Sequence, residues 1–283
     1  METGERVGVV TGATSGIGRA AAFALARHGL SLALVCRSRA KGEALAAALR
    51  AETGNPRIAI FGADLAVQAE IRRVAGELLA RYPRIQLLLN NAGVVNLRFE
   101  ETPDGIETTF AVNHLAYFLL TELLRPRLVA SAPARIVSVA SDAHRFGKLD
   151  LDDLEYRTRR YRSMQVYGSS KLLNLLWTYE LARRLEGTGV SANAMHPGGV
   201  RTGLGDQNGP VLAALGKVVK LFMRSPERGA DTAVWLATAP ELEGVSGRYY
   251  YDRKEHRSLP ITYDRAAQQR LWEISERRTG LAG

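Results

Sequence analysis

The chain has 283 residues, of which 46% are hydrophobic and 24% are charged. This ordinary globular composition excludes a disordered, collagen-like or coiled-coil protein, and a single cysteine, Cys36, excludes a disulfide scaffold or a multi-cysteine metal site. The net charge of +9 is spread along the chain, which favours attraction to small anions or an anionic surface over a nucleic-acid-binding face.

Short apolar runs alternate with helical stretches along the sequence. The predicted strands are 6–10, 32–36, 58–63, 85–89, 135–139, 190–195 and 248–251. The predicted helices are 17–27, 39–51, 69–81, 105–130 and 164–185. Because the strands are nearly continuous apolar runs, they are expected to be buried on both faces of a parallel sheet. Residues 1–283 are therefore predicted to form one α/β domain, a doubly wound Rossmann-type sheet of about seven strands flanked by helices.

The sequence shows no pattern typical of export or of membrane insertion. The first ten residues lack the charged-then-apolar pattern of a signal peptide. An uninterrupted apolar run of about 18 residues, as a spanning helix requires, is also missing from the sequence. The expected location is the cytoplasm.

A glycine-rich turn joins the first strand to the first helix. Gly12 permits the tight turn, Gly16 lets the backbone approach a pyrophosphate, and Gly18 lets the helix pack close to the strand. The helix N-terminus then offers free N–H groups to phosphates, whereas the alternative is an ordinary structural turn. The cofactor-binding candidates in this loop are Gly12, Thr14, Ser15, Gly16, Ile17 and Gly18.

The residues after the second strand predict the cofactor. An NAD-binding fold usually places an acid there, but this chain has Arg37 and Ser38. An arginine pairs with a 2′-phosphate that an acid would repel, so NADP(H) is expected in preference to NAD(H). The alternative is that Arg37 is a solvated residue at the strand end.

Tyr167 and Lys171 are four residues apart on a predicted helix, so they share one face. A neighbouring ammonium favours phenolate, which predicts a lowered Tyr167 pKa and proton exchange with a substrate oxygen near neutral pH. The pair gains weight because it follows the fifth strand, near the sheet edge where ligands bind.

These motifs, with Asp64-Leu65, Asn90 to Gly93, Asn113, Ser141 and His196-Pro197-Gly198 in the same order, resemble the short-chain dehydrogenase/reductase family over nearly the whole chain. The resemblance implies that Tyr167 is the general acid/base, that Ser141 binds the substrate oxygen, and that Lys171 holds the nicotinamide ribose. It further implies that Asn113 holds a water in a proton relay through Lys171. The other cofactor contacts that it implies are Asp64, Leu65, Asn91, Ala92, Gly93, Pro197, Gly198, Val200 and Thr202.

The serine after the fifth strand departs from the family pattern. Ala140 replaces the first member of the usual Ser-Ser pair, Ser141 keeps the catalytic place, and Ser138 is expected to point elsewhere. The longer gap from Ser141 to Tyr167 resembles the retinol dehydrogenase and WW-domain oxidoreductase branch. His144 is either a substrate-side residue, as in that branch, or a plain loop histidine.

Residues 203–224 are predicted to form the substrate lid. Within them, 211–223 is an apolar run interrupted by Lys217 and Lys220. Such a helix could close over an apolar substrate, lie peripherally on a membrane surface, or pack on a partner subunit.

The sequence thus predicts an NADP(H)-dependent oxidoreductase that interconverts an apolar alcohol and its ketone or aldehyde, without a metal. One alternative is an epimerase or dehydratase of the same superfamily. Another is a non-catalytic NADP(H)-binding sensor that acts through a partner. A homodimer through the long helices is a further expectation, with a monomer as its alternative.

Overall fold

Eight strands form one sheet in the computed structural model, which describes residues 6–200 and 224–281. The strands are β1 (Val7–Thr11), β2 (Ser31–Cys36), β3 (Ile58–Gly62), β4 (Leu87–Asn90), β5 (Ala134–Val139), β6 (Val190–Met195), β7 (Tyr249–Tyr251) and β8 (Lys254–Glu255). Their order across the sheet is β3-β2-β1-β4-β5-β6-β7-β8, and every neighbouring pair is parallel except β7 with β8. The doubly wound parallel sheet predicted from the sequence is confirmed.

The eighth strand was not expected. It is a two-residue antiparallel strand that follows β7 through a tight turn at Asp252 and Arg253, which have φ values of 48° and 59°. Two successive residues with positive φ produce the hairpin twist that fits two neighbouring antiparallel strands. The sequence offered no glycine or asparagine in this turn to signal it.

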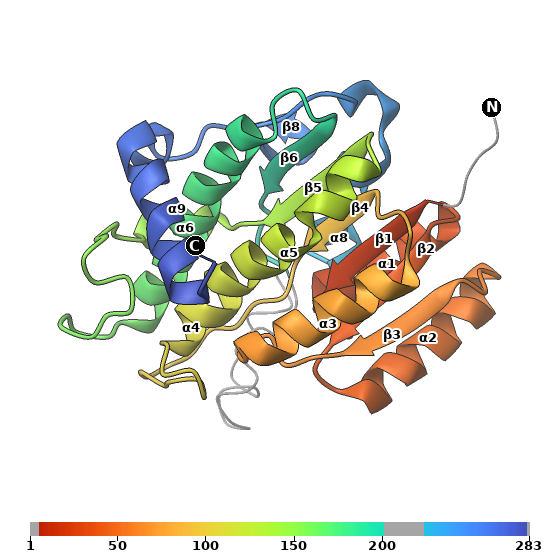
Figure 1. Ribbon diagram of the computed structural model, residues 1–283, viewed down its shortest axis with the longest axis horizontal. Coiled ribbons are helices and arrows are strands. Elements are labelled where there is room, and N and C mark those ends of the chain that lie inside the picture. Colours follow the sequence, from red (N-terminus) through yellow and green to blue (C-terminus); the bar gives the residue numbers. More distant parts are fainter. Residues whose placement is uncertain (1–5, 201–223, 282–283) are drawn as a thin grey trace.

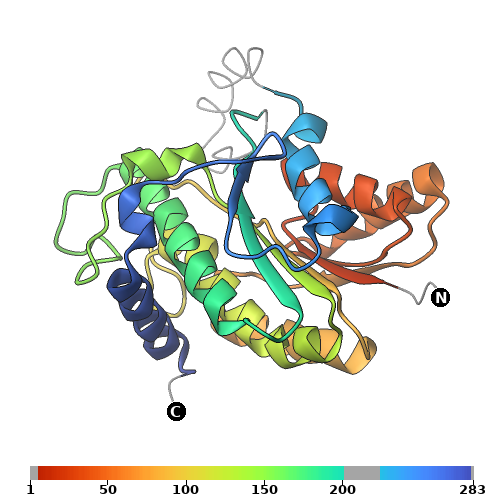
Figure 2. The ribbon, with the colours of Figure 1, turned by 90° about the horizontal axis from the view of Figure 1, so that it is seen from above.

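Helices cover both faces of the sheet. They are α1 (Gly16–Arg27), α2 (Arg39–Thr53), α3 (Gln68–Arg81), α4 (Thr108–Phe110), α5 (Ala116–Ala130), α6 (Ser163–Arg184), α8 (Pro226–Thr238) and α9 (Arg265–Thr279). Single turns η1 (Ala111–Leu115), η2 (Asp142–Phe146), η4 (Pro240–Leu242) and η5 (Pro260–Tyr263) complete the elements. Helices α3, α5, α6 and α9 lie on one face, and α1, α2 and α8 lie on the other (Figure 1, Figure 2).

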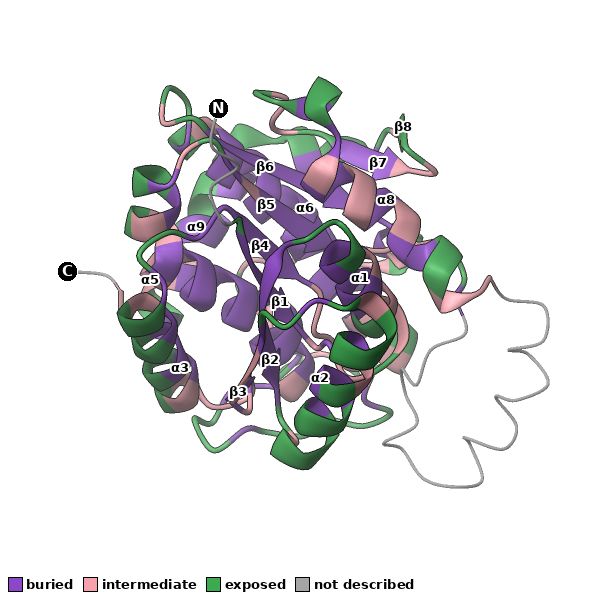
Figure 3. Ribbon diagram, turned by 90° about the vertical axis from the view of Figure 1, so that its right-hand side faces the viewer, coloured by how far each residue is buried: buried purple, intermediate pink, exposed green. Residues whose placement is uncertain are grey.

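The strands form the buried centre of the molecule, and the exposed residues lie on the outer sides of the helices (Figure 3). Every residue of β1, β2, β4 and β6 is buried, which is the burial that their continuous apolar runs predicted. One core cluster packs the α3, α5, α6 and α9 face, and a second packs the α1, α2 and α8 face. Because both faces are covered, the sheet exposes a functional edge only where its strands end.

Two helices and one irregular turn were missing from the sequence prediction. Helices α8 and α9 occupy stretches to which no element was assigned. The long helix expected over 105–130 begins instead at Thr108, where the Glu107 carboxylate accepts the N–H groups of Thr109 and Phe110. Its next turn, η1, is π-helical.

The predicted lid cannot be located in this fold. Residues 203–223 of that range, including the apolar run 211–223, lie outside the described residues. Among the helices that the structure does describe, none has the length and apolar character needed to cross a bilayer.

Helix α9 contributes a large buried side chain to the core, which gives a test of its packing. Trp272 is 1% exposed, and its ring meets Phe118 of α5 edge-on at a centroid distance of 5.0 Å. Replacing Trp272 by Ala should lower the free energy of unfolding by about 3–5 kcal/mol, the range for a large buried aromatic residue. Chemical denaturation measures this loss.

The matched control is Trp235 of α8, which is only partly buried. Trp235→Ala should cost about 1 kcal/mol, as an average substitution does. Equal losses at the two positions would show that α9 is not an integral part of the core.

Candidate active site

The turn after β1 leaves no room for a side chain at its glycine positions Gly12 and Gly18. Gly12 and Gly16 have φ values of +65° and +52°, in the left-handed region that glycine tolerates best. A Cβ on Gly18 would lie 2.4 Å from the carbonyl oxygen of Gly12 and 2.4 Å from Nδ2 of Asn91. The glycine loop therefore places the start of α1 directly against the ends of β1 and β4.

The N-terminus of α1 has no side-chain cap, although several other helices in the described residues do. Ser38, Ser225 and Asp264 accept backbone N–H groups at the starts of α2, α8 and α9, whereas the Ser15 side chain makes no such bond at α1. Thr14 is half-buried and Ser15 is exposed at this turn. The uncapped N–H groups and the positive end of the helix dipole make this terminus suitable for a phosphate.

Side-chain hydrogen bonds join the ends of β1 and β4. The backbone N–H groups of Asn91 and Ala92 donate to Thr11 Oγ1 over 2.9 and 3.1 Å. In addition, Nδ2 of the Asn91 side chain donates to the carbonyl oxygens of Thr11 and Gly12 over 2.8 and 3.2 Å. The floor of the candidate cofactor site is thus one bonded unit.

Asn113 lies fully buried in the π-helical turn η1. Its Oδ1 accepts the Val94 N–H over 2.8 Å, and its Nδ2 donates to the Val94 carbonyl and to Ser170 Oγ, both over 3.0 Å. A Cβ on Gly93 would lie 3.4 Å from Asn113 Oδ1 and 3.7 Å from Lys171 Nζ. The polar ends of Asn113 and Lys171 therefore meet beside Gly93, and π-turns of this kind often mark functional sites.

Ser141 and Tyr167 face one another across the end of β5. Ser141 follows the strand, and its Oγ accepts the Ala143 N–H over 3.1 Å at the start of η2. Burial raises the pKa of Tyr167 to about 12, while a hydrogen bond from the Ser141 side chain acts in the opposite direction. The Tyr167 phenol is therefore protonated near neutral pH.

Lys171 is buried, and its ammonium is turned toward the backbone. Its Nζ donates to the Val139 carbonyl over 2.9 Å and lies 5.7 Å from the Tyr167 ring centroid. Burial lowers the pKa of Lys171 to about 7. The expectation that Lys171 lowers the Tyr167 pKa does not hold in this structure, because removal of both groups from water dominates their pKa values.

The other serine of β5 does not take part in this group. Ser138 is fully buried within the sheet, where it pairs with Asn90 of β4 and Ala194 of β6. Its side chain therefore lies inside the fold, whereas Ser141 stands past the strand end.

The two interpretations of His144 are resolved by its surroundings. His144 is fully buried, its Nδ1 lies 2.8 Å from the Ser141 carbonyl oxygen, and its Nε2 accepts the Leu259 N–H over 3.3 Å. The Leu259 N–H can only donate, so Nδ1 carries the ring proton. Both ring nitrogens are bonded to the backbone, so His144 holds the Ser141 turn in place and has no nitrogen left for a substrate.

Arg37 and Ser38 lie at the end of β2, where the sequence predicted the residues that distinguish NADP(H) from NAD(H). Arg37 is exposed, and within the described residues no ion pair or hydrogen bond engages its guanidinium. The two other arginines considered for this site already have partners. Arg39 forms an ion pair with Glu43 at 3.8 Å, and the Arg19 guanidinium lies 4.7 Å above the Phe23 ring.

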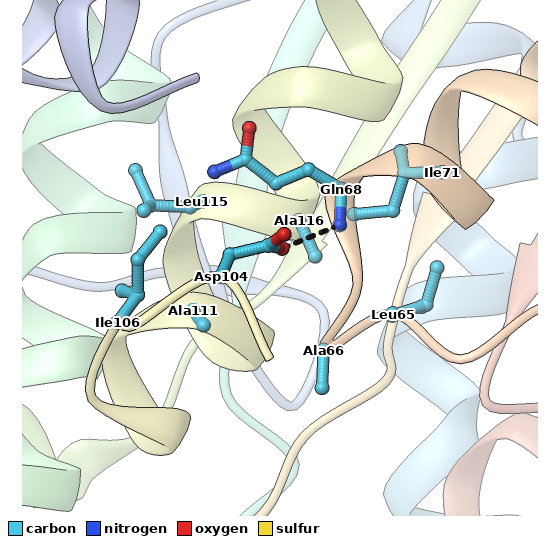
Figure 4. Close-up of a pocket in the computed structure, with 9 residues that line it drawn as sticks. All are labelled: Leu65, Ala66, Gln68, Ile71, Asp104, Ile106, Ala111, Leu115 and Ala116. Atoms are coloured by element: carbon cyan, nitrogen blue, oxygen red, sulfur yellow. Dashed lines mark hydrogen bonds between the residues drawn. The ribbon is translucent and has the colours of Figure 1, made fainter. Parts of the chain in front are cut away.

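Asp64 and Leu65 follow β3 at the same edge. The Asp64 carboxylate accepts the Ala66 N–H over 3.0 Å, which fixes the turn into α3. A small pocket beside this turn continues to Asp104 and the start of α5 (Figure 4). It is lined by Leu65, Ala66, Gln68, Ile71, Asp104, Ile106, Ala111, Leu115 and Ala116. None of the glycine-loop residues lines it, so the pocket borders the candidate cofactor site without forming it.

The residues after β6 complete the site on its other side. Pro197 and Gly198 are half-buried, and Gly198 has a φ of +75°. Val200 is buried, and a Cβ on Gly229 of α8 would lie 2.6 Å from it and 3.4 Å from Ile17. Val200 therefore packs where the glycine loop and α8 meet. Thr202 lies outside the described residues.

Three residues of the site were missed in the sequence. Ser170 bonds Asn113, Tyr117 donates its hydroxyl to the Ala92 carbonyl over 2.8 Å, and Arg224 forms an ion pair with Asp252. Ser170 stands next to Lys171, and Tyr117 stands four residues after Asn113, so helical spacing could have indicated both. Arg224 had no local signal, because its partner is distant in the sequence.

Comparisons with known proteins agree with this geometry. The family model for short chain dehydrogenases matches residues 6–211. Human retinol dehydrogenase 13 is 43% identical over 278 residues, which cover 96% of this chain and 84% of that protein. The crystal structure of an uncharacterized protein from Mycobacterium paratuberculosis superposes with a TM-score of 0.78 at 31% identity and covers 98% of this chain and 94% of that one. A short chain dehydrogenase from Burkholderia cenocepacia J2315 in complex with NADP superposes with a TM-score of 0.67 at 26% identity and covers 87% and 95% of the two chains.

The lowered pKa of Lys171 predicts a pH dependence of stability. The folded pKa is about 7, whereas an unfolded lysine titrates near ~10.4, so between these values the unfolded chain binds more protons. The free energy of unfolding should therefore rise with pH between about 7 and 10 because of this group. Lys171→Met, which keeps an unbranched side chain without the charge, should remove that rise.

Urea denaturation of both proteins without cofactor, from pH 6.5 to 9.5, measures the difference. Subtracting the two curves cancels the other groups that titrate in this range. Parallel curves for the two proteins would show that Lys171 keeps its ordinary pKa in the fold.

Proposed function

The chain belongs to the short-chain dehydrogenase family, and we propose that it is an NADP(H)-dependent oxidoreductase that interconverts an apolar alcohol and its ketone or aldehyde. The observation that carries the proposal is the convergence of Ser141, Tyr167, Lys171 and Asn113 at the carboxyl edge of the sheet, beside the glycine loop. Ligands bind at this edge in doubly wound sheets.

The residues present fit a dinucleotide phosphate. The uncapped start of α1 suits the pyrophosphate, and the close contacts of Gly12 and Gly18 exclude a side chain at these two positions. Arg37 offers an unengaged guanidinium where an NAD-specific site would carry an acid. The NADP complex of the Burkholderia relative is consistent with this choice.

Tyr167 is proposed as the proton donor to the substrate oxygen. When bound, the nicotinamide supplies or accepts the hydride, and the protein supplies orientation and proton transfer. The raised Tyr167 pKa keeps the phenol protonated, which suits carbonyl reduction. The Ser141 hydroxyl lies in hydrogen-bonding reach of that phenol and can hold the same substrate oxygen.

Lys171 and Asn113 are proposed as the route by which Tyr167 regains its proton. A lysine with a pKa of about 7 can lose or gain a proton near neutral pH at little cost. Asn113 fixes the residues around the Lys171 ammonium through its bonds to Val94 and Ser170. A water held beside Gly93 would extend this route to solvent.

An apolar substrate is proposed from the surroundings of Tyr167. Phe146 and Met164 are 66% and 56% exposed, although both are large and apolar. Gly147, next to Phe146, packs on Gly168, and Met164 lies one helical turn before Tyr167, so both apolar residues stand near Tyr167 in the fold. Retinol, which the name of retinol dehydrogenase 13 gives, is an apolar alcohol and the first candidate to assay.

The test is NADPH consumption, followed by absorbance, with retinal and a panel of apolar ketones and aldehydes. Turnover with an apolar carbonyl supports the proposal. Tight NADPH binding without turnover of any compound would favour a non-catalytic sensor. Conversion of an alcohol without net change in cofactor would favour an epimerase or dehydratase.

Replacing Tyr167 by Phe should abolish most turnover and leave NADPH binding nearly intact. The substitution removes only the hydroxyl, and general acid/base groups typically contribute about 10²–10⁴-fold to the rate. Steady-state kinetics and a fluorescence titration of NADPH measure the two effects. A variant that keeps more than about a tenth of the wild-type rate would exclude Tyr167 as the acid, given that range.

The two serines of the β5 segment give a matched pair. Ser141→Ala should reduce kcat strongly, because its hydroxyl faces Tyr167, whereas Ser138→Ala should change it little. The comparison of kcat/KM for both variants with wild type decides between them. Equal losses would contradict the choice of Ser141.

Arg37 should set the preference for NADPH. A charge-assisted hydrogen bond contributes about 1.5–3 kcal/mol, and about 1.4 kcal/mol corresponds to a factor of ten, so wild type should prefer NADPH at least tenfold in kcat/KM. Arg37→Asp should reverse the preference, because its carboxylate repels the 2′-phosphate and accepts ribose hydroxyls. The control is Arg39→Asp, which removes an arginine already paired with Glu43. A wild-type enzyme that uses both cofactors equally, or equal effects of the two variants, would remove Arg37 from this role.

A further inference from the structure

Three metal-ligating side chains meet beside the candidate active site but outside it. Asp142 begins η2, His196 follows β6, and His256 follows β8. One ligand atom of each residue lies within 4.8 Å of those of the other two. The three come from separate parts of the chain, so the fold itself brings them together.

His196 has a buried ring nitrogen without a partner. The residue is 5% exposed, its Nδ1 accepts the Gly198 N–H over 3.2 Å, and its Nε2 makes no hydrogen bond within the described residues. Among all the residues that the structure describes, the other buried side-chain nitrogens without a hydrogen-bond partner are Asn174 Nδ2 and Trp177 Nε1. Only an imidazole nitrogen is a metal ligand, and a buried polar atom left unbonded is costly.

Aromatic rings fix the orientation of the two imidazoles. Tyr251 stacks on His196 with a centroid distance of 4.1 Å and an interplanar angle of 9°. Tyr249 lies 5.6 Å from the His196 ring and 5.8 Å from the His256 ring. Aromatic neighbours of this kind hold the imidazole ligands in place, while Asp142 is exposed and His256 is half-buried.

Two guanidinium groups, those of Arg145 and Arg224, lie near the three proposed ligands. Asp142 forms a hydrogen-bonded ion pair with Arg145 over 2.8 Å, and Arg224, paired with Asp252, acts on His196 through its charge. The neighbouring His144 has both ring nitrogens bonded to the backbone and is neutral, so it does not compete for a cation. A cation bound between the three ligands would therefore compete with Arg145 for Asp142.

We propose that Asp142, His196 and His256 form a binding site for one divalent transition-metal ion of the Zn²⁺ class. Two imidazoles and one carboxylate suit Zn²⁺, Co²⁺ or Ni²⁺, whereas Mg²⁺ and Ca²⁺ prefer oxygen ligands alone. Three protein ligands leave a fourth position for water.

Metal binding would also act on the neighbouring backbone. A metal on Nε2 requires the His196 ring proton on Nδ1, so the Gly198 N–H would lose its present acceptor. Gly198 belongs to the segment after β6 that borders the candidate cofactor site. Bound metal therefore links η2, the segment after β6 and the segment after β8 into one unit, next to Ser141.

The test uses the full chain without an affinity tag, stripped of metal with a chelator. Co²⁺ is added and its visible d–d absorption is followed, and the Zn²⁺ affinity is measured by competition with a chromophoric chelator. One ion per chain is expected. His256→Ala and Asp142→Asn should each weaken binding at least about tenfold, since even partners outside the ligand set typically contribute 10–100-fold.

Two variants make the test specific. Arg145→Gln should tighten binding, because it releases Asp142 from its ion pair. His28→Ala should leave binding unchanged, because His28 is exposed at the end of α1. Thermal denaturation without metal confirms that each variant folds. No stoichiometric binding to folded wild type, or equal affinity in wild type and both ligand variants, would overturn the proposal.

Discussion

The site depends on the hydrogen bonds that join β1 and β4 at their carboxyl ends. Thr11 Oγ1 accepts two backbone N–H groups from the residues that follow β4. The side-chain amide of Asn91 donates two hydrogen bonds to carbonyl oxygens at the end of β1. Tyr117 of α5 extends the unit by donating to the Ala92 carbonyl, and its ring lies 5.6 Å from the Lys171 ammonium. The glycine loop and the surroundings of Lys171 on α6 thus meet at this group of bonds, so a side chain at Gly12 or Gly18 would disturb both.

Burial sets the electrostatics of the proposed catalytic pair. Removal from water favours the uncharged form of each group, which raises the Tyr167 pKa and lowers the Lys171 pKa. The Tyr167 pKa therefore lies above the Lys171 pKa, which is the reverse of the order expected if Lys171 simply stabilised a phenolate beside it. In the described residues the ammonium is instead oriented by the Val139 carbonyl, at the end of the strand that leads to Ser141.

Much of this fold could be predicted from local patterns. Continuous apolar runs identified seven strands, and glycines at fixed spacing identified the turn into α1, because both signals lie within a few residues. The parts that were missed depend on distant partners. Helix α9 has few apolar residues, and its Trp272 is buried only because α5 lies against it. The role of His144 needs the Leu259 N–H, which is 115 residues away. The pKa values of Tyr167 and Lys171 needed the depth of burial, which the four-residue spacing does not contain.

The C-terminal segment supports the site although it lies beyond residue 211, where the family match ends. Leu259 holds His144, and through it the Ser141 turn. Ser275 of α9 lies 2.9 Å from Nε2 of His114, the neighbour of Asn113 in the π-helical turn. Burial lowers the His114 pKa to about 4, so this contact is made by a neutral ring whose other nitrogen faces Asn174 of α6. The C-terminal segment therefore supports both turns, because Leu259 bonds the His144 ring that holds the Ser141 turn, and Ser275 of α9 contacts the His114 ring next to Asn113.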